Sequence, residues 1–186
     1  MRLVVLGGPG SGKGTQTRRL SKSLRVPMVS MGDVLRQAIA AETALGQKAE
    51  PYVSRGELLP DGIIIQFARQ RLVQEDLQKS WILEGYPRTA FQAEELDFLL
   101  EELAQPLDWA LYFDIEEQSM VERSLRRGLF DDTPEAIQRR ILAFHERTIP
   151  IMEYYQGKKK LLTISAQKDA NTVEQEVLSL LRDREL

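Results

Sequence analysis

The chain contains no cysteine and a single histidine, and these two shortages exclude several classes of protein. Without cysteine there can be no disulfide framework, thiolate zinc site, iron–sulfur cluster or cysteine nucleophile. With His145 as the one imidazole, the chain cannot build a multi-histidine metal centre either. The chain therefore lacks the ligands that most metalloenzyme mechanisms require.

Long apolar runs and an excess of one charge are also missing. The apolar runs, Leu3–Leu6 among them, are far shorter than a membrane span, and no signal-peptide pattern precedes Leu3. The 186 residues carry 25 Lys and Arg against 28 Asp and Glu, which argues against sequence-independent nucleic-acid binding. We expect a cytoplasmic monomer with one packed domain and no membrane or nucleic-acid partner. Any bound anion must be held by locally placed positive charge.

The chain does contain an alternation of short apolar runs with longer amphipathic stretches. The runs expected to form strands are Leu3–Gly7, Pro27–Ser30, Trp81–Gly85, Trp109–Ile115 and Leu161–Ser165. The stretches with helical spacing are Lys13–Leu24, Asp61–Leu77, Phe91–Leu103, Glu117–Arg127, Thr133–Tyr155 and Thr172–Leu181. We expect Pro150 to kink the fifth stretch, and Asn171 or Thr172 to cap the last. The pattern predicts an α/β fold, with a five-stranded parallel sheet covered by helices on both faces.

Two segments interrupt this alternation. Residues 30–60 have helical spacing without a strand and read as a small helical insertion, whereas residues 126–133 form a short polar connection and a candidate lid. Residues 1–29, 61–125 and 134–186 then make up the core domain. Ligands of open parallel sheets bind beyond the carboxyl ends of the strands, so both segments are placed to cover one.

A glycine-rich segment directly follows the first expected strand and precedes a helix. It reads Gly-Gly-Pro-Gly-Ser-Gly-Lys-Gly-Thr over residues 7–15, which is the context that a nucleotide-phosphate loop requires. Its glycines let successive N–H groups converge on an anion at the start of the helix, where Lys13 can reach the β- and γ-phosphates. The general pattern has Ser or Thr directly after the lysine, but here Gly14 intervenes and the hydroxyl follows at Thr15.

This shifted loop and three further motifs resemble the adenylate kinase family of nucleoside monophosphate kinases. Residues 30–36, Ser-Met-Gly-Asp-Val-Leu-Arg, are similar to the family's Ser-Thr-Gly-Asp-x-Leu-Arg. Residues 84–89, Glu-Gly-Tyr-Pro-Arg-Thr, are similar to its Asp-Gly-Tyr-Pro-Arg-Thr, and Gln92 stands where the family has a base-reading glutamine. Arg123, Arg127, Asp131, Asp132 and Arg140 follow the order of the family's lid and the next helix. The resemblance implies a three-layer fold of the P-loop NTPase type.

The resemblance also implies reversible transfer of the γ-phosphoryl group of ATP to AMP, which gives two ADP. Such a transfer needs positioning and cancellation of charge more than covalent chemistry from the protein. The implied catalytic residues are Lys13, Arg88, Arg123, Arg127 and Arg140. The implied ATP-binding residues are Gly10, Ser11, Gly12, Lys13, Gly14, Thr15, Arg123, Arg127 and Lys168. The implied AMP-binding residues are Met31, Arg36, Glu57, Leu58, Leu59, Gly85, Tyr86, Pro87, Arg88, Gln92 and Arg140.

Mg²⁺ is the implied cofactor, bound with ATP and held by the protein through water at Glu84 and Asp33. No zinc is expected, because the short lid has none of the cysteines that hold zinc in longer lids. Three positions depart from the family's pattern. Glu84 replaces an Asp, Met31 replaces a Thr beside the acceptor base, and Leu129 stands where short lids commonly have an arginine.

Two alternative functions stay open at this point. A pyrimidine or broader nucleoside monophosphate kinase is favoured by Met31 and opposed by Gln92. A switch module that binds ATP without transferring phosphate is the other reading. It predicts that acceptor-site arginines are missing, whereas Arg36 and Arg88 are both present.

Overall fold

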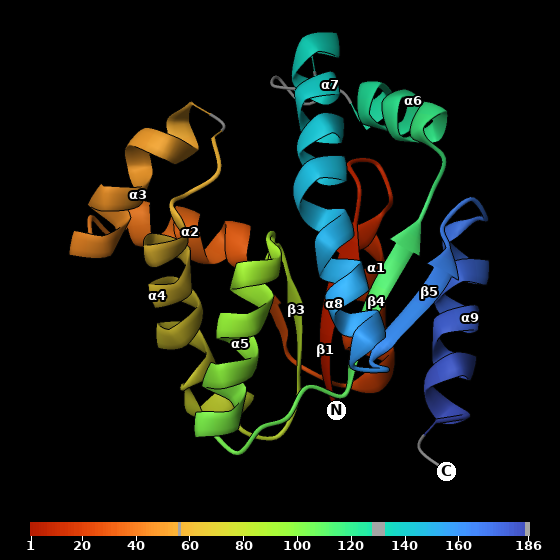
Figure 1. Ribbon diagram of the computed structural model, residues 1–186, viewed down its shortest axis with the longest axis horizontal. Helices are drawn as coiled ribbons and strands as arrows, with labels where there is room; N and C mark the ends of the chain where they lie inside the picture. Colours follow the sequence, from red (N-terminus) through yellow and green to blue (C-terminus); the bar gives the residue numbers. More distant parts are fainter. Residues whose placement is uncertain (56, 128–132, 185–186) are drawn as a thin grey trace.

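A five-stranded parallel sheet forms the centre of the computed structural model, which describes residues 1–55, 57–127 and 133–184 (Figure 1). The strands are β1 (Arg2–Gly7), β2 (Met28–Ser30), β3 (Trp81–Glu84), β4 (Trp109–Asp114) and β5 (Leu161–Ser165). Their order in the sheet is β2-β3-β1-β4-β5, and each neighbouring pair is parallel. The five predicted strands are confirmed, each to within one residue at either end.

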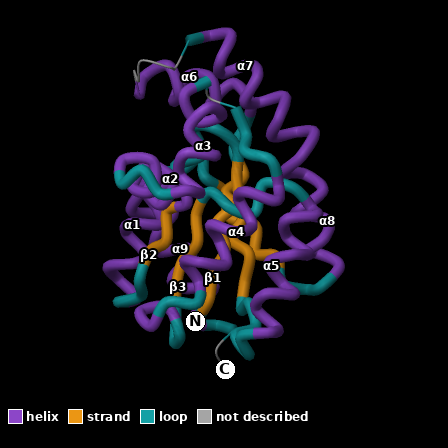
Figure 2. Tube along the Cα trace, turned by 90° about the vertical axis from the view of Figure 1, so that its left-hand side faces the viewer, coloured by secondary structure: helices purple, strands orange, loops and turns teal. Residues whose placement is uncertain are grey.

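Helices cover both faces of this sheet, because a parallel pair of strands needs a crossover connection. The helices of the core are α1 (Lys13–Leu24), α4 (Asp61–Leu72), α5 (Ala90–Glu102), α8 (Ile149–Gly157) and α9 (Ala170–Arg182). α1 and α9 pack together on one face, and α5 packs between α4 and α8 on the other. Figure 2 shows the strands between α1 and the pair α5 and α8. Leu3, Ile82 and Leu111 on the inner strands are wholly buried, as expected for strands with two covered faces.

The remaining helices gather at the end of the sheet to which the strands point, while both termini lie at the opposite end (Figure 1). They are α2 (Met31–Ala40), α3 (Ala44–Ser54), α6 (Glu117–Arg127) and α7 (Pro134–Ala143). Ser30 caps α2 and Thr43 caps α3, because each hydroxyl accepts a hydrogen bond from the backbone N–H of the third residue of the helix. α2 and α3 approach so closely that a Cβ on Gly46 would lie 2.2 Å from the Ala38 oxygen.

Two local expectations are corrected by the structure. The stretch predicted as one helix kinked at Pro150 contains a π-helical segment, Phe144–Thr148, which lies before the proline and joins α7 to α8. Pro150 has no N–H to give to the carbonyl four residues earlier, and the Ile149 N–H instead bonds to the Phe144 oxygen five residues back. The cap of α9 is Asp169, not Asn171 or Thr172, whose N–H groups both donate to its carboxylate.

The predicted helix over 61–77 also divides: α4 ends at Leu72, and a short 3₁₀ helix covers Glu75–Leu77. Within the described ranges, no helix has the length and apolar character needed to cross a membrane.

A partly buried ion pair joins α1 to α9, and we expect it to stabilise the fold. Arg19 Nε lies 2.7 Å from Glu174 Oε2, and the Ser23 hydroxyl donates to Glu174 Oε1 at 2.7 Å. Glu174→Ala should lower the free energy of unfolding by about 1–2 kcal/mol in urea titrations, because the nearly buried carboxylate loses its bonds to Ser23 and to Arg19, whose side chain is 35% exposed. Glu176→Ala, which removes another carboxylate of α9, should cost less than about 1 kcal/mol, because its partner Lys168 is exposed.

The hydrogen bonds from Ser23 and Arg19 lower the pKa of Glu174 from its ordinary value. A carboxylate whose pKa is lower in the folded than in the unfolded state stabilises the protein above the unfolded pKa. That stabilisation is lost as pH falls through the folded pKa. The difference between wild type and Glu174→Ala should therefore shrink in acid, and a constant difference would contradict the role given to the pair.

Candidate active site

The glycine-rich segment forms a loop between β1 and α1, at the carboxyl end of the sheet. Gly10 and Gly12 have φ of 70° and 82°, the left-handed region that favours glycine. Gly12 is the N-cap of α1, and it supplies no side-chain bond to the first N–H groups of the helix. These N–H groups, together with the positive end of the helix dipole, can bind an anion.

Lys13 lies across this loop and has an unusual pKa. Its Nζ donates to the backbone oxygens of Gly7 at 2.7 Å and Gly8 at 2.6 Å. Desolvation lowers the pKa of Lys13 to about 8, with Arg88 and Arg127 adding to the shift and Glu84 opposing it. The ammonium is thus held in a place that lacks a full negative counter-charge, which a phosphate group would supply.

This low pKa predicts a pH dependence of nucleotide binding. Phosphates next to Lys13 raise its pKa, so binding takes up a proton when the free lysine is neutral. The affinity for ATP should be constant below pH 8 and fall above it, by up to about tenfold for each pH unit. Calorimetric titrations between pH 7 and 10 would measure it, and Lys13→Met should remove the pH dependence. A wild-type affinity that stays flat up to pH 10 would contradict the assignment.

Glu84 and Arg88 stand beside this loop, because β3 and β1 are neighbours in the sheet and end at the same edge. Glu84 is the last residue of β3, and the Arg88 Nε donates to the Gly85 oxygen at 2.9 Å. Desolvation lowers the pKa of Arg88, and Glu84 opposes the shift. Arg keeps its charge at neutral pH despite such a shift, so the site has a fixed cation.

Gln92 is buried behind Arg88, and both ends of its amide are engaged. Its Oε1 accepts from the Arg88 backbone N–H at 2.7 Å, and its Nε2 donates to Asp61 Oδ1 at 2.6 Å. The hydroxyl of Tyr86, also buried, donates to the backbone oxygen of Gln92 at 3.1 Å. Sequence reasoning did not select Asp61. It is an acidic residue in the first turn of α4, which is common enough to give no signal.

The other predicted acceptor-side residues lie on or after α2 and α3. Met31 is buried against Gly85, whereas the exposed Arg36 forms an ion pair with Asp33. Glu57 is exposed and pairs with Arg55 at 2.8 Å, next to the half-buried Leu58 and Leu59. Pro87 follows Tyr86 through a cis peptide bond. The structure thus brings Met31, Gly85, Arg88 and Gln92 together, and leaves Arg36 and Glu57 on local partners.

A hollow of about 200 Å³ lies on the other side of the phosphate loop. Its lining residues are Gly10, Ser11, Gly12, Thr15, Gln16, Arg123, Ala166, Lys168, Ala170 and Val173. Arg123 bonds to the loop after β5, donating to the Ala166 oxygen at 2.8 Å and the Gln167 oxygen at 3.1 Å. Lys168 pairs with Glu176 at 2.8 Å. The hollow therefore gathers six of the nine predicted ATP-side residues, from the loop, α6 and the segment after β5, whereas Lys13, Gly14 and Arg127 do not line it.

The comparisons with known proteins agree with one another. The family model for adenylate kinase matches residues 5–160. The chain belongs to the adenylate kinase family. It is 63% identical to adenylate kinase 2 of Synechocystis sp. over 97% of this chain and 100% of the relative. It is 54% identical to adenylate kinase 2 of Nostoc sp., over 97% and 98%, and 39% identical to the adenylate kinase of Stenotrophomonas maltophilia, over 98% and 100%.

Members of this family use ATP with a metal, and the site can be tested for one. In the part of the chain that the structure describes, no three His, Cys, Asp or Glu side chains gather closely enough to ligate an ion directly. Glu84 ends β3 and is close enough to Lys13 to affect its pKa, whereas Asp33 lies in the first turn of α2 and pairs with Arg36. Their arrangement fits an ion that takes its ligands from nucleotide phosphates and water.

The segment predicted to form a lid, residues 126–133, is only partly described. Arg127 ends α6, and its charge contributes to lowering the pKa of Lys13. Arg140 lies half-buried on α7. The predictions for Leu129, Asp131 and Asp132 concern residues outside the described ranges.

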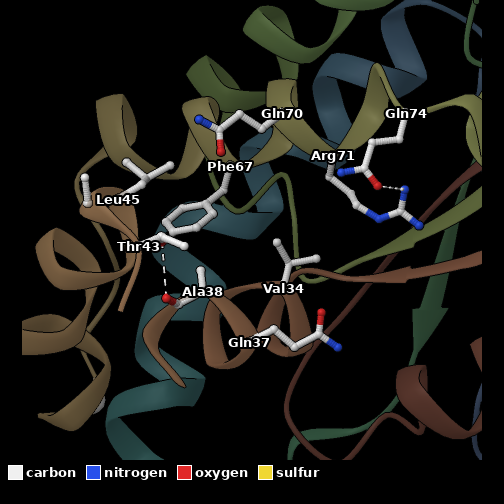
Figure 3. A pocket seen from close by; sticks show the side chains of 10 residues that line it. Val34, Gln37, Ala38, Thr43, Leu45, Phe67, Gln70, Arg71 and Gln74 are labelled. Carbon is white, nitrogen blue, oxygen red and sulfur yellow. Dashed lines mark hydrogen bonds between the residues drawn. The ribbon is translucent and has the colours of Figure 1, made fainter. Parts of the chain in front are cut away.

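A second hollow, of about 640 Å³, separates α2 and the start of α3 from α4 (Figure 3). Val34 and Ala38 come from α2, and Phe67 and Arg71 face them from α4. None of its lining residues belongs to the predicted nucleotide site. The hollow leaves space between α4 and the two helices that precede it, α2 and α3.

Proposed function

We propose that this protein transfers the γ-phosphoryl group of ATP to AMP, reversibly, and so interconverts ATP and AMP with two ADP. The observation that carries the proposal is the position of the phosphate loop between two groups of nucleotide-binding residues. On the β3 side stand Arg88 and Gln92, and on the β4 side stands the hollow with Arg123. Two phosphorylated ligands can therefore approach Lys13 from opposite sides.

In this proposal the cations have separate tasks. Arg36 and Arg88 hold the AMP phosphate, Lys13 and Arg123 act near the transferred group, and Arg127 and Arg140 close over it. The planar guanidinium of Arg gives two directed bonds to a phosphate, which suits each arginine to this task. The ion pair of Arg36 with Asp33 supports a role for Asp33 in holding Arg36 ready until AMP replaces it.

We assign the ATP side to the loop residues from Gly10 to Thr15 and to Lys168, which line or adjoin the smaller hollow. The AMP side comprises Met31, Arg36, Glu57, Leu58, Leu59, Gly85, Tyr86, Pro87, Arg88, Gln92 and Arg140. The metal is Mg²⁺, held through water by Glu84 and Asp33, and it would neutralise charge on the ATP phosphates. One chain supplies all these residues, which supports a monomer, and we place its activity in the cytoplasm.

We further propose that residues 30–60 and 126–133 move as an acceptor-binding insertion and a lid, relative to a core of residues 1–29, 61–125 and 134–186. The close approach of Gly46 to Ala38 supports motion of α2 and α3 as one unit. The hollow between that unit and α4 supplies space for the motion. Closure would exclude water, whose attack on ATP would waste the phosphoryl group.

Coupled measurement of ADP formation tests the proposal. Purified protein, ATP and Mg²⁺ are assayed with AMP, dAMP, CMP, UMP or GMP as the acceptor, and the highest kcat/KM is expected with AMP. A preference for CMP or UMP would overturn AMP as the acceptor and assign a pyrimidine monophosphate kinase. Binding of ATP without transfer to any acceptor would assign a switch module and overturn phosphoryl transfer.

A further inference from the structure

The amide of Gln92 is held in one orientation by two partners of opposite kind. The backbone N–H of Arg88 can only donate, so it requires the oxygen of the amide, Oε1, at 2.7 Å. The Asp61 carboxylate can only accept when ionised, so it requires the nitrogen, Nε2, at 2.6 Å. Turning the amide by 180° would place donor against donor at one end and acceptor against acceptor at the other.

Asp61 and Gln92 each lie in the first turn of a helix. Asp61 begins α4, directly after Pro60, and Thr89 caps α5 by accepting from the Gln92 N–H at 3.1 Å. Gln92 itself is 4% exposed, and the carboxylate of Asp61 is half-buried beside it. A hydrogen bond to a charged group in such a place is stronger than one between neutral groups.

We propose that Asp61 is a positioning residue that sets the acceptor-base specificity of the reaction by preventing rotation of the Gln92 amide. The proposal rests on the proposed function, in which Gln92 faces the base of the monophosphate. The two bonds described use one hydrogen of Nε2 and one lone pair of Oε1. A second hydrogen and a second lone pair remain available for a base.

A fixed amide distinguishes two purines that differ only at position 6. Adenine presents an acceptor at N1 and a donor at its 6-amino group, so it matches an N–H and a lone pair in a fixed order. Hypoxanthine, the base of IMP, presents a donor at N1 and an acceptor at position 6, which is the reverse order. A glutamine free to rotate can serve both bases, whereas one locked by Asp61 serves adenine and rejects hypoxanthine.

The test compares the dissociation constants of AMP and IMP, measured by calorimetry, in wild type and variants. Wild type should prefer AMP, and Asp61→Ala should reduce that preference about tenfold, mainly by tightening IMP relative to AMP. Asp61→Glu keeps a carboxylate that can only accept and should restore most of the preference, whereas Asp61→Asn can donate or accept and should lose the preference as Asp61→Ala does. Serine suits the start of a helix but is too short to reach Gln92. Asp61→Ser should therefore reduce the preference as expected for Asp61→Ala, and it replaces that variant if the alanine protein folds poorly.

Two controls separate positioning from a general structural effect. Asp76→Ala removes another carboxylate near the far end of the same helix, where it pairs with Arg71, and should leave the AMP-to-IMP ratio unchanged. In the Gln92→Ala background, Asp61→Ala should have no further effect on the ratio, because its effect passes through the amide.

Equal weakening of AMP and IMP in Asp61→Ala, or additive effects of Asp61→Ala and Gln92→Ala, would overturn the inference and leave Asp61 a structural residue. Phosphoryl transfer to AMP by the wild type is measured in the same preparation. If that transfer is absent, the proposed function fails; if it is present and the ratio does not move, only the role of Asp61 fails.

Discussion

Lys13→Met should lower kcat/KM for ADP formation by about two to three orders of magnitude. Methionine keeps the length and most of the volume of the side chain but removes the ammonium. The lost cation is the one that reaches from α1 across the phosphate loop, in a place where desolvation makes electrostatic interactions strong. Steady-state assays with ATP and AMP measure the loss, and kcat should fall more than KM rises if the charge acts on the transferred group.

Lys22→Met is the matched control, because Lys22 lies on the same helix, exposed in its last turn. Its kcat/KM should equal that of the wild type. The Nζ of Lys13 also ties together the Gly7 and Gly8 oxygens, so thermal unfolding of Lys13→Met should be followed in parallel. A folded Lys13→Met variant that retains more than about a tenth of the activity would contradict the assignment of Lys13.

Gly10→Ala should lower the free energy of unfolding by about 3 kcal/mol. Gly10 has φ of 70°, and a Cβ there would lie 2.7 Å from the Met120 oxygen of α6, so the substitution combines backbone strain with a clash against backbone. Either the loop or α6 must move to relieve the contact. Urea unfolding of the nucleotide-free protein measures the loss, and the affinity for ATP should fall as well.

Gly12→Ala separates the two causes. Gly12 also has a left-handed φ, of 82°, but a Cβ there meets nothing within 4 Å. Its cost should be the conformational strain alone, about 1 kcal/mol. Equal losses in the two variants would mean that the packing of the loop against Met120 does not contribute.

The sheet and its strands were predictable from sequence because each strand is a short apolar run between helical stretches. The inner strands are buried on both faces, whereas β5, at the edge, alternates buried and exposed residues. The phosphate loop was equally predictable, since its glycines, Lys13 and Thr15 form a local pattern between a strand and a helix. The AMP-side motifs were found only through the family resemblance. Residues such as Arg88 and Gln92 carry no local signal that says what they bind.

The parts that sequence reasoning missed depend on contacts between distant segments. Asp61 stands out only because it accepts a hydrogen bond from Gln92, which lies 31 positions further along the chain. The π-helical segment before Pro150 follows from how the backbone accommodates a missing N–H, and helical periodicity of side chains does not reveal it. The cap at Asp169 was missed because Asp, Asn and Thr are all favourable caps and stand close together here.

The ion pair between α1 and α9 has a consequence for the order of events during synthesis. α9 comes after all the other described helices and strands. Its Glu174 nevertheless pairs with Arg19 of α1, and its Ala170 and Val173 line the smaller hollow. A growing polypeptide can carry an intact glycine loop long before these residues leave the ribosome. We therefore expect chains truncated before residue 170 to lack ATP affinity, although they contain the glycine loop.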